Sequence, residues 1–530
     1  MKRRSFISML GAGAALPMAL SGMKVTAFSR SPLLDILARV ECEDRILVLV
    51  QMAGGNDGLN MIVPLDQYAA YKAARPAIAV PETGTGAALK LTNATGINPQ
   101  MAAVQQMYAN GLMRVIQNVG YPVPDSSHFR STDIWMSASD SATVVETGWL
   151  GRWLDSVYPG FPAGYPSASM PHPVAISVGN FVTLSTESST ANVAMAFSNP
   201  TTYYNIVNYG SGAQRNTRFL KELDFIRTTG EQIQQFATPV KAAAAKATNK
   251  STKYPAASAG NTLADQLKIV AQLIAGGLKT RVYLVTQTGY DTHANQLNGG
   301  NGTPYSHPAL LNQLSVALDA FMDDCRLLGI DEKIVGMTFS EFGRRIQQNG
   351  SAGTDHGAAA PMLVFGKNVL GGGILGTNPV IPQNVTAQDN VPMQFDFRSV
   401  YASILRDWLC VKEADIRTLL MGSFPFLPII NTANVSDVRD DGTPMVKRRL
   451  GCSDNPASDA VTVWVESDGG TTRLSLFDTT GREIAVVFEQ QLAVGRHAVP
   501  YAVSALPSGT YYWRLQTSSY SQTSPMMVVH

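Results

Sequence analysis

Short continuous apolar runs recur along the first part of the chain, and they alternate with longer segments in which apolar residues follow helical spacing. An apolar run without polar interruptions is typical of a strand that is buried on both faces, as in a parallel sheet. Such runs predict strands over residues 45–50, 112–118, 281–286, 333–338 and 361–365. Helical spacing predicts helices over residues 101–109, 129–136, 215–236, 263–274 and 308–328. The succession predicts an α/β domain, a large, mostly parallel sheet flanked by helices.

The pattern changes near residue 459. Short alternating runs predict strands over residues 461–465, 473–477, 483–488 and 510–515, and turn signals such as Asp468-Gly469-Gly470 separate them. We expect a small antiparallel β-sandwich over residues 459–530, a linker over residues 431–458, and the α/β domain over residues 42–430.

The N-terminal segment has the pattern of an export signal. The basic opening Met1-Lys2-Arg3-Arg4 precedes an apolar run from Met9 to about Leu20, which is too short for a comfortable membrane span. The Arg-Arg-x-Phe-Ile order resembles a twin-arginine signal, so residues 1–30 are predicted to be such a signal. A general secretory signal and an uncleaved anchor are the alternatives. No other segment is apolar enough to span a bilayer, so we expect no transmembrane span in the mature chain.

Composition and charge narrow the class of protein. Of 530 residues, 45% are hydrophobic and 15% are charged, which is typical of a globular protein. A net charge of +1 gives no bulk attraction to nucleic acid, so no nucleic-acid partner is expected. The four cysteines lie far apart, which excludes Cys-x-x-Cys metal sites. Buried free thiols are the favoured interpretation, although an exported protein permits disulfides.

Residues with metal-binding side chains gather where predicted strands end. In a parallel sheet the carboxyl ends of the strands meet at one edge, so these side chains are expected to converge there. Carboxylates and imidazoles without thiolates suit one or two divalent ions of zinc, manganese, magnesium or calcium. The candidate metal ligands are Asp57, Asp291, His293, Glu341, Asp355 and His356.

A hydroxyl at the start of a predicted helix provides a candidate nucleophile. Ser126 or Ser127 lies at the start of the helix at 129–136, where free backbone N–H groups favour an anion. Ser127 is the candidate nucleophile, and a metal ion beside it would activate the hydroxyl. Less specific interpretations remain open: Asp57 as a turn cap, Ser127 as a helix cap, and Glu341 as an ion-pair partner of an arginine. The candidate substrate-binding residues are His128, Arg130, Arg344 and Arg345.

Several motifs together resemble the DUF1501 family, a group of exported bacterial proteins placed in the alkaline-phosphatase superfamily. The resemblance covers about residues 45–415. The matching stretches are Gly54-Gly55-Asn56-Asp57-Gly58-Leu59-Asn60, Ser127-His128-Phe129, Gly148-Trp149-Leu150-Gly151-Arg152, Tyr290-Asp291-Thr292-His293-Ala294-Asn295-Gln296, Ser340-Glu341-Phe342-Gly343-Arg344-Arg345, Gly353-Thr354-Asp355-His356-Gly357 and Asp396-Phe397-Arg398-Ser399-Val400-Tyr401.

The resemblance implies an alkaline-phosphatase-like fold and metal-dependent cleavage of phosphate or sulfate esters. By position, it implies that Asp57 is an early metal ligand and Ser127 the nucleophile, and that Asp291, His293 and His356 hold metal. Phe342 stands where the superfamily usually has a histidine, which leaves a one-metal site or a non-catalytic site as alternatives. The Cys/Ser-x-Pro-x-Arg element of sulfatases is absent, so a formylglycine enzyme is not expected.

The tail resembles the C-terminal sorting domain of the type IX secretion system. The matching stretches are Leu476-Phe477-Asp478-Thr479-Thr480-Gly481-Arg482 and Leu506-Pro507-Ser508-Gly509-Thr510-Tyr511-Tyr512, with a short end at residues 526–529. The resemblance implies that residues 459–530 engage the secretion machinery of a Bacteroidetes-like bacterium. It places the protein in the periplasm, at the cell surface or outside the cell. An accessory carbohydrate-binding sandwich is the alternative.

These observations predict an exported metal-dependent hydrolase of phosphate or sulfate esters, with glycan esters among the substrates considered. The alternative is a catalytically degenerate surface protein that keeps the fold and uses it for binding. Convergence of the candidate ligands in one cavity would favour the enzyme, whereas dispersal of the ligands, or filling of the cavity by Phe342, would favour the binding protein.

Overall fold

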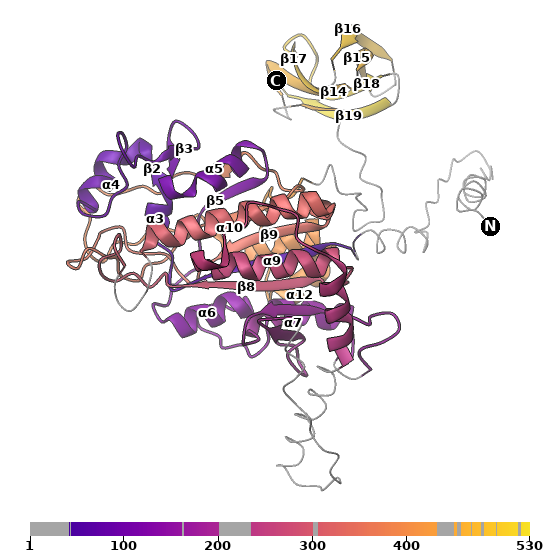
Figure 1. Cartoon of the computed structure of the whole chain (residues 1–530). Helices are drawn as coiled ribbons and strands as arrows, with labels where there is room; N and C mark the ends of the chain where they lie inside the picture. The colour runs from indigo at the N-terminus through magenta and orange to yellow at the C-terminus, as the bar shows by residue number, and fades with distance from the viewer. Residues whose placement is uncertain are drawn as a thin grey trace. The chain divides into compact units, whose positions relative to one another are not determined.

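The computed structural model describes residues 42, 44–161, 164–200, 235–299 and 306–431, and then residues 450–452, 457–467, 469–478, 482–493, 495–517 and 521–529. The chain forms two compact units, residues 1–435 and residues 436–530 (Figure 1). The predicted export signal, nearly all of the predicted helix at 215–236 and most of the predicted linker lie outside the described residues.

A single large sheet organises the first unit. All neighbouring strands run parallel except β10, which runs antiparallel to β5 and β9, so the prediction of a mostly parallel sheet is confirmed. The strand order is β11 (Gly373–Leu375), β5 (Met113–Gly120), β10 (Ala360–Phe365), β9 (Ile334–Phe339), β1 (Ile46–Ala53), β8 (Val282–Thr288), β6 (Ala175–Val178) and β7 (Ala194–Phe197), and β12 (Phe395–Asp396) also pairs with β5.

Helices cover both faces of this sheet, which explains the uninterrupted apolar strands. In β1, Leu47 and Leu49 join one buried cluster, while Val48 and Val50 join the other. One face packs against α5 (Ala102–Ala109), α9 (Thr262–Ala275) and α10 (His307–Leu328). The other packs against α6 (His128–Ser137), α7 (Trp149–Val157) and α12 (Glu413–Leu419) (Figure 1). It also packs against α11 (Phe397–Ser403) and the π-helical turn η7 (Ile404–Trp408).

Small elements follow β1 and form a separate cluster beside the sheet. They carry their own buried residues, among them Leu59, Tyr71 and Val80. The elements are α3 (Gly58–Met61), β2 (Ile62–Pro64), η1 (Leu65–Gln67), α4 (Tyr68–Ala74), β3 (Leu89–Lys90), β4 (Thr95–Ile97) and η2 (Pro99–Met101). Elsewhere in the unit are η3 (Leu184–Thr186), η5 (Ala257–Ala259) and η6 (Asp331–Lys333).

A disulfide joins Cys42, shortly before β1, to Cys410, shortly after η7. The favoured prediction of free thiols is therefore wrong for these two residues, because the fold brings together positions that are 368 residues apart in sequence. It is correct for Cys325, which is free and buried in α10.

The second unit is a pair of antiparallel sheets with a shared core, as predicted. One sheet contains β13 (Leu450–Cys452), β14 (Ala460–Ser467) and β17 (Gly495–Ala502). The other contains β15 (Gly470–Asp478), β16 (Glu483–Leu492), β18 (Gly509–Gln516) and β19 (Ser521–Val528). Val463 of one sheet and Leu476 and Trp513 of the other belong to one buried cluster, so the sheets form a sandwich.

Candidate functional site

Four side chains converge at the edge of the sheet where the parallel strands end. His128 begins α6 after β5, Asp291 and His293 follow β8, and His356 precedes β10. Because β10 runs against its neighbours, its start lies at the same edge as the ends of the others. These four residues, His128, Asp291, His293 and His356, are called the histidine cluster below.

The contacts of the histidine cluster centre on the Asp291 carboxylate. Its Oδ1 atom lies 3.1 Å from Nε2 of His293 and 3.4 Å from Nε2 of His356, and its Oδ2 atom lies 3.5 Å from Nε2 of His128. The Nε2 atoms of His293 and His356 are 2.9 Å apart. The predicted convergence at one edge therefore holds for Asp291, His293 and His356.

The opposite ring nitrogen of each histidine meets an oxygen atom. Nδ1 of His128 lies 2.8 Å from Glu341, Nδ1 of His293 lies 3.1 Å from Asp355, and Nδ1 of His356 lies 2.8 Å from the carbonyl of Ser126. Carbonyl and carboxylate oxygens accept hydrogen bonds, so the Nδ1 atoms carry a hydrogen and the Nε2 atoms face Asp291. This tautomer pattern is typical of metal-bound histidines with outer hydrogen-bond partners.

The electrostatics of the histidine cluster suit a cation. Burial raises the pKa of Asp291, but the hydrogen bond and charge of Arg344 outweigh it and hold that pKa below its ordinary value, so Asp291 is ionised. Burial lowers the pKa of His356, which favours its neutral form, whereas the hydrogen bond with Glu341 raises the pKa of His128. Two Nε2 lone pairs as close as those of His293 and His356 need a cation or a proton between them. One carboxylate and three imidazoles are a donor set that zinc prefers.

Glu341 and Asp355, predicted as metal ligands, lie behind the histidines. Glu341 is buried and accepts hydrogen bonds from Gly54 N–H at 2.8 Å as well as from His128. Asp355 accepts from Asn349 at 3.0 Å and from His293. Their observed contacts orient the rings. His128, predicted to bind substrate, instead points its Nε2 atom into the cluster.

Asp57, the other predicted ligand, lies apart from the histidine cluster. It is fully buried, and its two carboxylate oxygens accept hydrogen bonds from Arg75 at 2.7 and 2.6 Å. Gln296 donates a further hydrogen bond to Oδ2 at 2.6 Å. Burial raises the pKa of Asp57, but Arg75 more than compensates and keeps it low, so the pair is ionic. We therefore do not count Asp57 among the metal ligands. Sequence reasoning overlooked Arg75 and Gln296, because neither belongs to a metal-ligand residue type.

Phe342 packs directly against the histidine cluster. Its side chain is buried, and its ring centroid lies 4.4 Å from that of His356 and 4.9 Å from that of His128. It therefore fills the space beside the cluster on the β9 side. Across the described parts of the chain, only His128, Asp291 and His356 form a group of three or more suitable side chains with ligand atoms within 4.8 Å of one another.

The three predicted anion-binding arginines are engaged with the protein itself. Arg344 is buried and donates to the carbonyls of Gly54, Gly55, Tyr290 and Thr354 and to Asp291. Arg130 donates to the carbonyls of Asp140, Ser141 and Thr143. Arg345 donates to the carbonyls of His356 and Gln388. These bonds fix the loops around the cluster.

Ser127 occupies the N-cap position of α6, one residue before His128. Its Oγ atom accepts a long hydrogen bond of 3.5 Å from Arg130 N–H, and the side chain is exposed. The neighbouring Ser126 contributes its backbone carbonyl to His356, so its own hydroxyl is not needed for that bond. Ser127 therefore combines an accessible hydroxyl with a position adjoining the histidine cluster.

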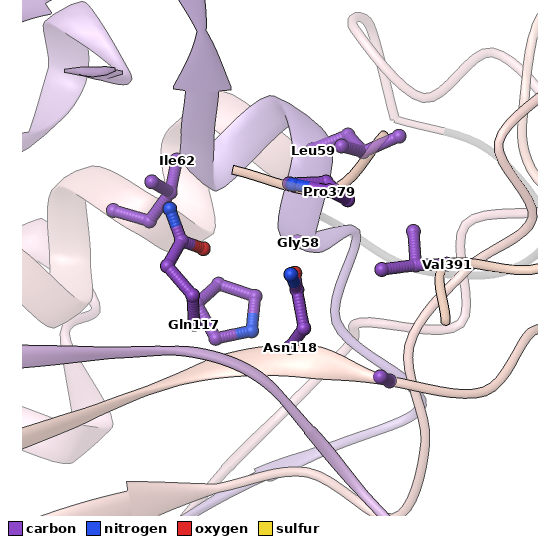
Figure 2. Close-up of a pocket in the computed structure, with 9 residues that line it drawn as sticks. Gly58, Leu59, Ile62, Gln117, Asn118, Pro379 and Val391 are labelled. Atoms are coloured by element: carbon purple, nitrogen blue, oxygen red, sulfur yellow. The ribbon is translucent and has the colours of Figure 1, made fainter. Parts of the chain in front are cut away.

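A small pocket lies elsewhere in the first unit, between α3 and the end of β5. Figure 2 shows Asn118 of β5 pointing towards Gly58 of α3, with Pro379 and Val391 closing the sides. None of its lining residues belongs to the histidine cluster. The pocket is therefore separate from the candidate site.

Solved structures similar to this chain are distant from it. A protein of the alkaline phosphatase superfamily from Vibrio parahaemolyticus is 9% identical over 85% of this chain and 82% of its own, with a TM-score of 0.31. A sulfatase from Pseudoalteromonas sp. is 11% identical over 90% and 89%, with a TM-score of 0.30. At these TM-scores the likeness assigns no activity. No curated protein is significantly similar to the chain in sequence.

The second unit matches the model of a secretion system C-terminal sorting domain over residues 455–529. PorZ, a surface component of the type-IX secretion system of Porphyromonas gingivalis, is 18% identical over 19% of this chain and 14% of its own, with a TM-score of 0.12. The sorting-domain match indicates export to the cell surface or beyond. Among the helices that the structure describes, none is both long and apolar enough to cross a membrane.

One family model matches most of the first unit. The match covers residues 44–413, which include every residue of the histidine cluster, and the model is described as a protein of unknown function. The chain therefore belongs to the DUF1501 family.

Proposed function

We propose that the histidine cluster binds one divalent metal ion and that the protein is an exported hydrolase of phosphate or sulfate esters. The observation that carries this proposal is the shared orientation of three histidines. Each has its Nδ1 atom held by an oxygen and its Nε2 atom directed at Asp291. The ligands would be Nε2 of His128, His293 and His356 and a carboxylate oxygen of Asp291.

A divalent ion held there would supply Lewis-acid chemistry, polarising the ester group and favouring the ionised form of a nearby hydroxyl. Ser127 is the proposed nucleophile: its Oγ atom would attack phosphorus or sulfur while the ester oxygen departs, and water would later release the transferred group. Glu341 and Asp355 hold the rings of His128 and His293 in place. In this proposal Arg130, Arg344 and Arg345 do not bind the substrate.

The competing proposal is a surface protein that binds metal without catalysis. The packing of Phe342 against two histidines favours this alternative. Two-metal esterases use their two ions to hold the attacking and the leaving oxygen. With Phe342 beside the cluster, we propose room for one ion only. The two proposals share the metal site and differ only in turnover.

Metal content and ester cleavage, measured on the same samples, test both proposals. We expect the wild type to hold near-stoichiometric metal and to cleave aryl phosphate or aryl sulfate. His356→Ala should lose both the metal and the cleavage activity. Ser127→Ala should keep the metal and lose cleavage by on the order of a thousandfold. Ser126→Ala is the matched control, since only the backbone of Ser126 contacts the cluster. Metal without cleavage of either ester would favour the binding protein, and a metal-free wild type would contradict both proposals.

A further inference from the structure

We infer that Gln296 is a positioning residue that couples the two metal-ligand loops to the buried Asp57–Arg75 ion pair. The inference rests on the proposed metal site and assigns a role to Asp57 other than metal ligation. Gln296, Asp57 and Arg75 are each fully or almost fully buried. A buried polar network of this kind is stable only when its members are hydrogen-bonded.

The side chain of Gln296 reaches three partners with both ends of its amide. Its Nε2 atom donates to Asp57 Oδ2 at 2.6 Å. Its Oε1 atom accepts from the hydroxyls of Thr292 at 3.1 Å and Thr354 at 2.8 Å. Because the Asp57 carboxylate only accepts hydrogen bonds, the amide has one orientation, with its oxygen turned towards the two threonines.

The two threonines belong to the loops that carry the ligands. Thr292 lies between Asp291 and His293, and Thr354 lies two residues before His356. The loops are also joined by a backbone bond of 3.1 Å from Thr354 N–H to the Thr292 carbonyl. Gln296 therefore holds, through one amide, the segments that supply three of the four proposed ligands.

Arg75 connects the same network to the start of the hairpin that leads to His356. Besides its pair with Asp57, it donates to the carbonyls of Arg345 and Ile346, both at 2.7 Å. Asp57 follows β1, a central strand of the sheet, so the network joins the ligand loops to the segment that leaves this strand. A residue acting in this way sets the spacing of the ligands without contacting the metal.

Zinc affinity, measured by competition with a chromogenic chelator, tests the inference. Gln296→Met has a similar volume and lacks the amide, so it should weaken zinc binding by about tenfold to a hundredfold. Gln117→Met is the matched control: Gln117 is also buried, donates to Asn378 at 3.0 Å, and lines the separate pocket of Figure 2. The control should bind zinc as tightly as the wild type.

A double-mutant cycle separates coupling from simple destabilisation. As a single change, Thr354→Val should weaken zinc binding. In the Gln296→Met background it should add little, because both changes break the hydrogen bond between Thr354 and Gln296. Should Gln296→Met fail to fold, weaker zinc binding by the folded Thr354→Val protein would still support the inference. A folded Gln296→Met protein that binds zinc as tightly as the wild type would overturn this inference but not the proposed metal site. So would a double variant whose loss of zinc affinity is the product of the two single losses. A folded wild type that binds no zinc would overturn the proposed metal site and this inference together.

Discussion

His307 is fully buried at the first position of α10, where its Nε2 atom lies 3.0 Å from Oδ1 of Asn56. Its Nδ1 atom has no hydrogen-bond partner among the described residues. Burial is the main reason that its pKa falls from 6.5 to about 4, and the positive charges of Arg75 and Arg344 add to the effect while Asp57 opposes it. The residue is therefore neutral in the folded protein above about pH 4.

The depressed pKa predicts an acid-sensitive contribution to stability. Between pH 6.5 and pH 4 the unfolded chain binds a proton at His307 that the folded chain does not, so stability falls as the pH falls through this window. The loss attributable to His307 should reach about 3 kcal/mol. Urea unfolding of the wild type and His307→Gln across this range measures it. Parallel pH profiles for the two proteins would contradict the assignment.

At the scale of elements, the segment between β9 and β10 folds back on itself as a hairpin that places Glu341 and His356. Three backbone hydrogen bonds join its two arms. Gly343 N–H donates to the Ala358 carbonyl at 2.8 Å, Arg345 N–H donates to the Asp355 carbonyl at 3.0 Å, and Gly357 N–H donates to the Gly343 carbonyl at 2.8 Å. A β-bridge pairs Arg344 with His356. The hairpin therefore fixes the distance between Glu341, which holds the ring of His128, and the ring of His356.

Close backbone contact at Gly357 makes this hairpin sensitive to substitution. A Cβ atom there would lie 2.4 Å from the backbone carbon of Arg344, so Gly357→Ala must push the strands apart. We expect a loss of about 1–3 kcal/mol in stability and weaker zinc binding. Gly350→Ala lies in the same segment with nothing within 4 Å of the added atom and serves as the control. Equal unfolding midpoints and zinc affinities for the two variants would show that the contact is unimportant.

Much of the fold follows from the sequence pattern. The apolar run at 333–338 became β9 (Ile334–Phe339), and the helical spacing at 308–328 became α10 (His307–Leu328). The pattern missed β6 and β7, because four-residue strands leave little periodicity to detect. The reversal of β10 was also missed, since an apolar run carries no sign of strand direction.

The convergence of side chains at the sheet edge was predicted in part, for a physical reason. Strand ends converge in any parallel sheet, so Asp291, His293 and His356 were expected to meet. Whether a carboxylate binds metal or an arginine depends on the partner that the tertiary fold supplies. Asp57 meets Arg75, and Glu341 meets His128, contacts that no spacing in the sequence reveals.

At the scale of the whole molecule, the Cys42–Cys410 disulfide closes almost the entire first unit into one loop. Constraining the unfolded chain in this way should stabilise the folded protein by about 2–5 kcal/mol. Reductant should lower the unfolding midpoint of the wild type to that of Cys42→Ser/Cys410→Ser and leave the double variant unchanged. A wild type whose midpoint is insensitive to reductant would contradict a stabilising role.

The two units have different roles. The sorting domain directs export, while the proposed site lies wholly in the first unit, between residues 128 and 356. An exported protein meets an environment in which the disulfide persists. We propose that this unit holds a single metal ion on three histidines and Asp291.

Anomalous diffraction from crystals grown with zinc would locate the ion. We expect one strong peak, bounded by Nε2 of His128, His293 and His356 and a carboxylate oxygen of Asp291, and no peak at Asp57. A second peak on the Phe342 side, a peak at Asp57, or no peak among the four residues would contradict this proposal.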